Sequence, residues 1–243
     1  MSDLVPELAR VLDPVGLNLI GTTDVGRYDD VVPPRWRLQP RVPGTRGLVI
    51  IGNGGGAFWS SFARARTADP RVGAGPDPLD VFTRAVVAET VAPVLARRGL
   101  PYRVVHPFDD GPLALSFTHA AEVAGLGRPS LLGVLLHPVY GPWMALRAAL
   151  LLPVVPVAAR PADGFDPCPS CTARPCVAAC PSAAVTATGW DAATCMATGG
   201  RPEDLCATAC HARLACVVGP EHRYPPAALA HHQGAARRIR PPR

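Results

Sequence analysis

Eight cysteines are the residues of this sequence best suited to chemistry, and all of them lie between Cys168 and Cys216. No cysteine precedes that segment. Thiolates ligate zinc and iron–sulfur clusters, and pairs of thiols form disulfides in oxidising compartments. Because the thiols are confined to one short stretch, we expect a compact module built around them.

The first four cysteines follow a recognisable spacing. The run Cys168-x2-Cys171-x4-Cys176-x3-Cys180-Pro resembles the bacterial ferredoxin run C-x2-C-x2-C-x3-C-P, with two extra residues before the third cysteine. In two-cluster ferredoxins the fourth cysteine of such a run ligates the other cluster. The resemblance therefore implies two 4Fe-4S clusters. One set of ligands is Cys168, Cys171, Cys176 and Cys216, and the other is Cys180, Cys195, Cys206 and Cys210.

Two other uses of the thiols are disfavoured. Structural zinc usually shows paired C-x2-C knuckles, and only Cys168 with Cys171 has that spacing. Disulfides require an oxidising compartment, but the first residues, MSDLVPELARVLDP, lack the basic and apolar regions of a secretory signal. We therefore expect a cytoplasmic protein.

Composition narrows the class of protein further. A chain of 243 residues that is 48% hydrophobic and 18% charged is not a disordered one. The net charge is +5, yet the arginines are scattered apart from a few near the C-terminal end, so a nucleic-acid partner is disfavoured. The longest apolar stretch, residues 131–159, is broken by prolines, a histidine and an arginine, and we expect no membrane span.

The elements that must position the cysteines alternate between strands and helices. Periodicity and capping residues predict helices over 3–12, 57–66, 77–98 and 113–124, and strands over 17–21, 48–52, 102–106 and 131–136. The polar stretch up to Arg46 is expected to be loop, Pro93 is expected to kink its helix, and the type of the apolar element over 143–152 stays open. The alternation indicates an α/β domain.

Three regions follow from this pattern. Residues 1–160 are expected to form the α/β domain, because four prolines between residues 153 and 167 indicate a linker. Residues 161–218 form the cysteine module, and residues 219–243 form a C-terminal tail.

A glycine-rich turn follows the predicted strand over 48–52. Its sequence from Gly52 to Ala57 fits a relaxed G-x-G-x-x-G/A, which binds pyrophosphate at a helix N-terminus in dinucleotide-binding folds. Such a site also needs a second strand that ends in an acid about 20 residues later, and no such strand is predicted here. A dinucleotide site is therefore disfavoured.

The segment LLGVLLHPVYGPWMALRAALLLP, from Leu131 to Pro153, resembles the core segment of the CblC-type cobalamin-processing proteins. The similarity extends to YDDVVPPRWRLQP from Tyr28 and HAAEVAGLG from His119. The chain is also similar to the epoxyqueuosine reductases and reductive dehalogenases, which join a cobalamin-binding domain to a two-cluster ferredoxin domain. These resemblances imply a nitroreductase-like α/β (α+β) fold that binds cobalamin base-off, with a small ferredoxin-like module.

Residues that match these families are candidates for cobalamin contact. They are Gly133, Val134, Leu135, His137, Tyr140, Trp143, Arg147, Arg223 and Tyr224. In CblC-type proteins the counterpart of Arg147 is associated with thiol-cofactor binding, and a match at Arg223 implies that the tail folds back onto the α/β domain. Ordinary packing can also explain these residues: the glycine in a strand, the histidine and tryptophan as structural groups, and each arginine paired with an internal carboxylate.

Two acidic positions complete the candidates. Asp109 resembles, with an offset of two residues, the aspartate that supplies a proton in epoxyqueuosine reductases, although an acid at a turn or helix start is the commoner explanation. Glu122 stands where animal CblC proteins carry a histidine, and His119 lies one turn earlier.

Together these features predict an iron–sulfur oxidoreductase that reduces cobalamin and removes its upper ligand, cyanide or alkyl. Electrons would come from a donor such as a ferredoxin or a flavoprotein reductase. Two alternatives stay open. One is a tRNA-modifying enzyme of the epoxyqueuosine reductase type, disfavoured by the absence of an arginine stripe and of a helical repeat after the cysteines. The other is a cobalamin chaperone or electron carrier without turnover.

Overall fold

The computed structural model describes residues 3–157, 164–198 and 205–238. Contacts divide the chain into two units. Unit 1 contains residues 3–126 and 145–157, and unit 2 contains residues 127–144, 164–198 and 205–238. Each unit is described by itself. The mixed helix and sheet class predicted from the sequence is confirmed.

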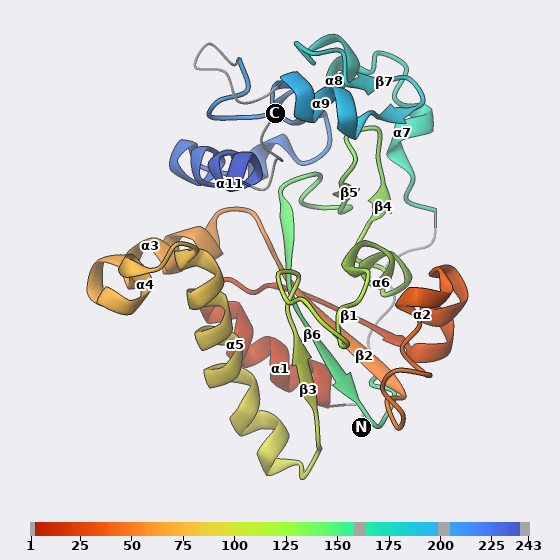
Figure 1. The fold of residues 1–243 in the computed structure, drawn as a ribbon, viewed down its shortest axis with the longest axis vertical. Helices are drawn as coiled ribbons and strands as arrows, with labels where there is room; N and C mark the ends of the chain where they lie inside the picture. Colours follow the sequence, from red (N-terminus) through yellow and green to blue (C-terminus); the bar gives the residue numbers. More distant parts are fainter. Residues whose placement is uncertain (1–2, 158–163, 199–204, 239–243) are drawn as a thin grey trace. The chain divides into compact units, whose positions relative to one another are not determined.

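Unit 1 is built on a four-stranded sheet with the order β1-β2-β6-β3 (Figure 1). The strands are β1 (Leu19–Asp24), β2 (Gly47–Gly54), β3 (Arg103–Val105) and β6 (Met144–Leu152). β1 pairs antiparallel with β2, with Leu19 opposite Gly52, and β3 pairs antiparallel with β6. The pairing of β2 with β1 differs from that of a dinucleotide fold, whose strands pair in parallel.

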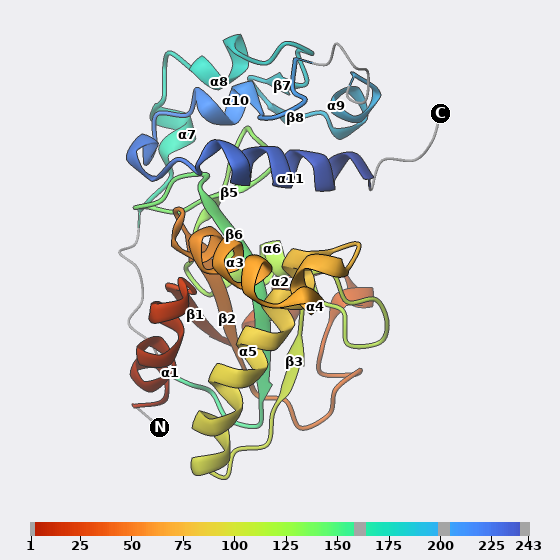
Figure 2. The same cartoon turned by 90° about the vertical axis from the view of Figure 1, so that its left-hand side faces the viewer.

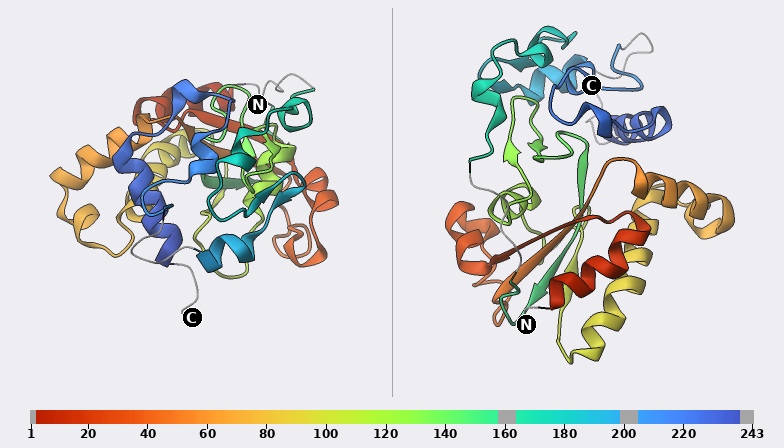
Figure 3. Two further views of the ribbon diagram at one scale, coloured as in Figure 1. Left: turned by 90° about the horizontal axis from the view of Figure 1, so that it is seen from above. Right: turned by 180° about the vertical axis from the view of Figure 1, so that it is seen from behind.

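Helices cover both faces of this sheet (Figures 1 and 3). On one side lie α1 (Leu4–Leu12), α3 (Ala57–Ala68), α4 (Pro70–Ala74) and α5 (Pro78–Arg97). On the other side lie α2 (Val25–Val31) and α6 (Phe117–Val123). Every residue of β2 is buried, because both of its faces are covered. This explains why β2 reads as a continuous apolar run rather than an alternating one.

The core of unit 1 is formed by the apolar sides of α1, α3 and α5 against one face of β2 and β6. Leu4, Leu8 and Leu12 keep helical spacing and are fully buried. α5 continues through Pro93 to Arg97, so the predicted helix extends to its expected end. A 3₁₀ turn, η1 (Asp13–Val15), connects α1 to β1.

The stretch before Arg46, expected to be loop, contains α2 and a 3₁₀ turn, η2 (Pro34–Trp36). Asp24 caps α2, because its carboxylate accepts a hydrogen bond from the backbone N–H of Arg27 at 2.9 Å. The carboxylate of Asp29 accepts the backbone N–H groups of Leu38 and Gln39 at 2.6 and 3.0 Å. These side-chain bonds to the backbone order a polar stretch that has no apolar periodicity.

Unit 2 consists of short elements and one longer helix, α11 (Figure 2). They are β4 (Arg128–Pro129), β5 (Leu135–Leu136), α7 (Pro167–Ser170), α8 (Pro175–Ala178), β7 (Val185–Thr186), β8 (Gly189–Trp190), α9 (Ala192–Thr198), α10 (His211–Leu214), η3 (Pro220–His222) and α11 (Pro226–Arg238). Figure 2 shows α11 running beneath the short helices of the same unit.

The strand expected over 131–136 is reduced to β5, and this prediction was wrong for its first four residues. Ser130 begins a turn there: its hydroxyl donates to the carbonyl oxygen of Val134 at 2.6 Å and accepts the backbone N–H of Leu132 at 3.2 Å. Gly133 has φ +72° within this turn. An apolar run does not reveal such a turn, because the signal lies in one hydroxyl and one glycine. The open element over 143–152 is the strand β6.

Candidate metal centre

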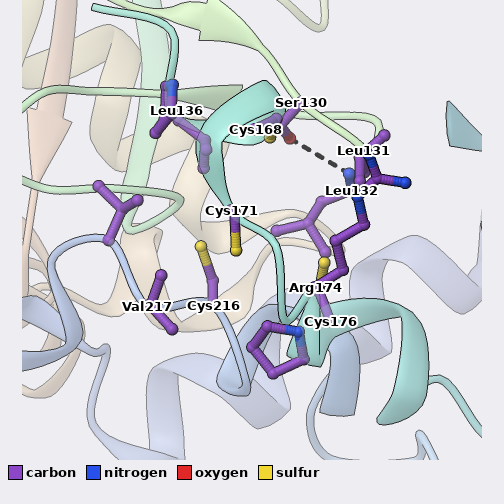
Figure 4. Close-up of a pocket in the computed structure, with 13 residues that line it drawn as sticks. Ser130, Leu131, Leu132, Leu136, Cys168, Cys171, Arg174, Cys176, Cys216 and Val217 are labelled. Atoms are coloured by element: carbon purple, nitrogen blue, oxygen red, sulfur yellow. Dashed lines mark hydrogen bonds between the residues drawn. The ribbon is translucent and has the colours of Figure 1, made fainter. Parts of the chain in front are cut away.

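Four cysteines line one pocket of unit 2 (Figure 4). They are Cys168, Cys171, Cys176 and Cys216. The pocket has about 390 Å³ of empty space, part of it open to solvent, and its other walls include Leu131, Leu132 and Leu136. Figure 4 shows the sulfur atoms of Cys171 and Cys216 pointing toward each other. The pocket thus gathers three cysteines of the first run with the last cysteine of the chain.

The thiols of this pocket interact electrostatically. Burial raises the pKa of the Cys176 thiol, and the neighbouring thiols of Cys216, Cys168 and Cys171 raise it further. Burial also raises the pKa of Cys216, again with contributions from Cys168 and Cys171. Several thiols that oppose one another's ionisation need a cationic core to become thiolates together.

A second group contains Cys180, Cys195 and Cys210. Burial raises the pKa of the Cys210 thiol, and the thiols of Cys195 and Cys180 act in the same direction. At Cys180 burial also raises the pKa, but hydrogen bonds from the Ser182 hydroxyl and nearby backbone groups outweigh it and lower the pKa overall. Cys206 is half-buried, and all eight cysteines are free thiols.

The four thiols of the pocket are the kind of ligand that an iron–sulfur cluster takes. Within residues 3–157, 164–198 and 205–238, no group of three or more His, Cys, Asp or Glu side chains is arranged to hold a metal ion. A cluster core of several atoms needs its thiolates farther apart than a single ion does, and thiolate is its usual ligand. The pocket supplies the second requirement, since all four of its cysteines offer thiols.

Gly133 and Val134 lie on the turn that precedes β5, and both are exposed. A Cβ atom at Gly133 would overlap the indole of Trp190, a residue of β8 with 43% of its surface exposed. The glycine therefore permits close packing of Trp190 in addition to the left-handed turn. Leu135, the next candidate, is buried.

His137 organises the following turn. Its backbone N–H and C=O bond to Gly141 at 2.9 and 2.8 Å, and its Nδ1 accepts the backbone N–H groups of Val139 and Tyr140 at 3.1 and 3.2 Å. Burial, with a smaller effect of the His222 charge, lowers the pKa of His137 to about 4. The imidazole is therefore neutral at physiological pH, and its Nε2–H is the group available to a ligand. Tyr140 packs between the rings of His137 and His222, with centroid distances of 5.1 and 4.6 Å.

Trp143 and Tyr224 form a buried aromatic pair with Arg213. The two rings meet edge-on with centroids 5.8 Å apart, and the Arg213 guanidinium lies 4.9 and 5.0 Å from the two centroids. In the described part of the chain, neither Trp143 Nε1 nor the Tyr224 hydroxyl has a hydrogen-bond partner. Arg223 is exposed and donates to the carbonyl oxygen of Leu214 at 2.7 Å. The tail thus packs on the HPVYGPW segment, within unit 2.

Arg147 belongs to β6 in unit 1 and is buried. Its Nε donates to Asn53 Oδ1 at 2.7 Å, and its guanidinium lies 4.9 Å from the centroid of the Phe58 ring. Its carbonyl oxygen is bonded to Nδ1 of the buried His106 at 2.9 Å. The charge of Arg147 also reaches Asp80, where it partly offsets the burial that raises the pKa of that carboxyl.

Asp109 is held by two partners in unit 1. Its Oδ1 accepts from Arg84, and its Oδ2 accepts the backbone N–H of His106 at 2.7 Å. Both oxygens therefore stabilise the turn after β3. Glu122 and His119 lie on α6, where the His119 ring bonds to the Ser116 hydroxyl at 2.7 Å.

Three residues that the sequence did not single out belong to these surroundings. Trp190 packs over Gly133, Arg213 stacks on Trp143, and Arg174 lines the cysteine pocket with φ +40°. Arg174 lies in the two-residue expansion of the first cysteine run, so the unusual spacing was its signal. Trp190 and Arg213 carry no local pattern, because only tertiary packing brings them to these positions.

No protein-family model matches this sequence, and no curated protein matches it by sequence. Solved structures do match its fold. A CblC B12-trafficking protein from C. elegans, a homologue of human MMACHC, is 14% identical with a TM-score of 0.63, over 96% of this chain and 92% of that chain. An epoxyqueuosine reductase solved with a modified tRNA stem loop is 17% identical with a TM-score of 0.60, over 92% and 67%.

A catabolic reductive dehalogenase is 17% identical with a TM-score of 0.50, over 96% of this chain and 36% of that chain. The sequence predicted a resemblance to these three kinds of protein, and this prediction is confirmed at the level of the fold. No helix in the described ranges is long and apolar enough to cross a membrane.

Proposed function

We propose that this protein is an iron–sulfur oxidoreductase that reduces cobalamin and thereby removes its upper ligand. The observation that carries the proposal is the pocket of unit 2. It combines four thiols with Leu131, Leu132 and Leu136 of the segment that resembles CblC-type proteins. The cysteine run and the cobalamin-type segment thus contribute to one site within one unit.

Two 4Fe-4S clusters, when bound, would accept and pass on single electrons. Cys168, Cys171, Cys176 and Cys216 would hold one of them, and Cys180, Cys195, Cys206 and Cys210 the other. The helix α10 connects the two proposed sites, because it begins after Cys210 and ends two residues before Cys216. The protein's part is to place these groups and to exclude water, while the electron donor supplies the electrons.

Cobalamin is the proposed substrate. Of the matching residues, Gly133 and Val134 are exposed and His137 and Tyr140 half-buried, so these four are accessible to it. His137 would offer its Nε2–H as a hydrogen-bond donor. Three buried residues would support the turn from its inner side: Leu135, Trp143 and Tyr224. Arg147, held by Asn53 and Phe58, would be a separate contact for a thiol cofactor or an anionic group.

The reaction balances with one electron from the donor. Cobalt in cyanocobalamin passes from the +3 to the +2 state, the cobalt–cyanide bond breaks, and cyanide leaves with both bonding electrons. No protein nucleophile is required. Asp109, with both oxygens engaged by Arg84 and the His106 amide, is not needed as a proton donor in this step.

The test uses anaerobically purified protein. We expect it to be brown, to contain iron and sulfide, to shift base-on cobalamin to the base-off absorbance, and to convert cyanocobalamin to cob(II)alamin when a reductant is added. Cys168→Ser and Cys180→Ser should each remove about half of the iron, because they belong to different clusters. Colourless protein that contains zinc, or an unchanged cyanocobalamin spectrum, would falsify the proposal.

The same assay separates the two alternatives. Multiple turnovers with release of product indicate an enzyme, whereas one turnover with retained cobalamin indicates a carrier or chaperone. The structure of an epoxyqueuosine reductase with a tRNA stem loop shares this fold, so a stem loop carrying epoxyqueuosine is the second substrate to test. Its conversion to queuosine, without cobalamin release, would favour the tRNA-modifying alternative.

A further inference from the structure

Trp190 is a large aromatic side chain that the fold leaves accessible to solvent. Its surface is 43% exposed, and among the described residues it is the only aromatic one in the set of exposed large hydrophobic side chains. It lies on β8, in the hairpin of the cysteine module, where its register partner is Val185. A tryptophan face supplies a flat apolar surface of the kind that lines small-molecule sites. We therefore asked which group this surface suits.

The backbone around Trp190 is held on both sides. Before it, the Thr186 hydroxyl donates to the carbonyl oxygen of Gly189 at 2.9 Å and closes the hairpin. After it, the backbone N–H of Asp191 donates to the carbonyl oxygen of Ala184 at 2.8 Å. A side chain on such a fixed backbone loses little conformational entropy when it binds a ligand.

The indole of Trp190 packs on the segment that is proposed to contact cobalamin. A Cβ atom at Gly133 would overlap Cδ2 and Cε3, two atoms of the six-membered part of the indole. The next residue, Val134, is 40% exposed, so two exposed apolar side chains flank the glycine. The residues before the glycine, Leu131 and Leu132, line the thiol pocket. All of these residues belong to unit 2.

Cobalamin has one group that matches a flat apolar surface of this kind. Its corrin ring carries amide side chains at its edge and methyl groups on its faces. The benzimidazole base of its nucleotide tail is instead a flat bicyclic ring, and both of its faces are free once the base has left the cobalt. Stacking of a base on an aromatic side chain needs only two such faces and is favourable for every base.

We propose that Trp190 stacks on the benzimidazole base of cobalamin and thereby favours the base-off form. The proposal rests on the proposed function, because it requires cobalamin to bind beside Gly133. In this step the bond between cobalt and the benzimidazole nitrogen breaks, and the nitrogen keeps its electron pair. No electron or proton is transferred, so Trp190 is a binding residue for the substrate.

The experiment compares cyanocobalamin with cyanocobinamide, which has the same corrin ring but lacks the nucleotide tail. Each is titrated into the full chain carrying its clusters, and the dissociation constant is measured by calorimetry. We expect Trp190→Ala to weaken cyanocobalamin binding by about 5- to 100-fold, as for the loss of one base–aromatic stack, and cyanocobinamide binding by less than about twofold. At saturation with cyanocobalamin, the base-off absorbance should be smaller than in the unmodified protein.

Two further variants distinguish the aromatic face from simple packing. Trp190→Phe keeps a ring and should keep most of the affinity for cyanocobalamin. Trp190→Leu keeps an apolar side chain over Gly133 without a π face, and it should show the same selective loss as Trp190→Ala. It also keeps the test decisive if Trp190→Ala does not fold. The matched control is Met196→Ala, because Met196 is also 43% exposed in unit 2, and this variant should bind both compounds normally.

The outcomes separate the inference from the proposed function. Equal losses for cyanocobalamin and cyanocobinamide would mean that Trp190 only supports the turn at Gly133, and that result would overturn the inference. Unchanged affinity for cyanocobalamin in Trp190→Leu would overturn it as well. Unmodified protein that binds neither compound would instead overturn the proposed function.

Discussion

Single side chains in this protein take their chemical state from burial. His106 is buried against β6, with its Nδ1–H donated to the carbonyl oxygen of Arg147 and its ring stacked on Phe108. Burial lowers the pKa of His106 below its ordinary value of 6.5, and this effect exceeds the opposing contributions of the Arg147 carbonyl and of Asp109. The folded protein therefore favours the neutral imidazole.

The lowered pKa of His106 predicts that the stability of the folded protein depends on pH. Because the folded pKa lies below the unfolded one, the stabilisation is fully present above about pH 6.5 and is lost as pH falls below that value. Denaturant unfolding should show a decrease of the unfolding free energy between pH 7.5 and 5.5. His106→Asn keeps a donor for the carbonyl and cannot titrate, so its decrease should be smaller. Equal decreases in both proteins would contradict the assignment.

At Tyr224 the contribution of the aromatic ring to stability can be measured separately from that of the hydroxyl. The ring is buried on Trp143, while the hydroxyl has no partner among the described residues. We expect Tyr224→Phe to change the unfolding free energy by less than about 0.5 kcal/mol or to raise it, since a buried unsatisfied group is costly. Tyr224→Ala should lose about 3–5 kcal/mol. Destabilisation by Tyr224→Phe comparable to that by Tyr224→Ala would reveal a hydrogen bond.

At the scale of elements, turns rather than long helices build the candidate site. The turn from His137 to Gly141 closes through two backbone hydrogen bonds, and the histidine side chain caps it from inside. Gly141 has φ +53°, and a Cβ atom there would overlap the carbonyl oxygen of Val218. The H-P-x-x-G spacing is therefore explained by this turn and by the backbone at Val218, which lies against it.

Gly141→Ala tests whether the turn and its contact with Val218 require a glycine. The left-handed conformation alone costs about 1–2 kcal/mol for a residue with a side chain, and displacement of the Val218 backbone adds to that. The control is Gly44→Ala, because Gly44 has φ +86° and open space around it. Gly141→Ala should lower the free energy of unfolding and the iron content of the loaded protein much more than Gly44→Ala does. Similar losses in both would mean that the contact with Val218 is unimportant.

At the scale of the whole molecule, the contacts group the chain differently from its order in sequence. The sequence boundary near residue 160 separates the cysteines from everything before them. The contacts instead join residues 127–144 to the cysteine segments and to residues 205–238. The segment that resembles CblC-type proteins is therefore divided between the units, with Arg147 in unit 1 and His137 in unit 2.

Removal of residues 219–243 tests the importance of this grouping. It deletes Tyr224, which covers Trp143, and Gly219, which packs against the backbone of Tyr140. We expect the fluorescence of Trp143 to shift to the red and cobalamin binding to be lost. A shorter deletion that keeps residues up to 225 retains both contacts and serves as the control. Full binding by the longer deletion would show that the tail is dispensable.

The sequence by itself determined the features that depend on local chemistry. The cysteine spacing indicated two ligand sets, apolar periodicity located α1, α3 and α5, and a continuous apolar run located β2. These signals are local because ligand loops, helix faces and buried strands each impose a short period on the chain. The turn at Ser130 and helix α2 were missed, since single side chains bonded to the backbone define them.

Only the tertiary structure decided which residues meet. It placed Leu131 and Leu132 in the wall of the thiol pocket, Trp190 over Gly133, and Arg213 against two aromatic rings. None of these contacts has a signature in spacing, because each joins segments far apart in the chain. Packing, charge and desolvation act through space, so these contacts leave no local pattern in the sequence.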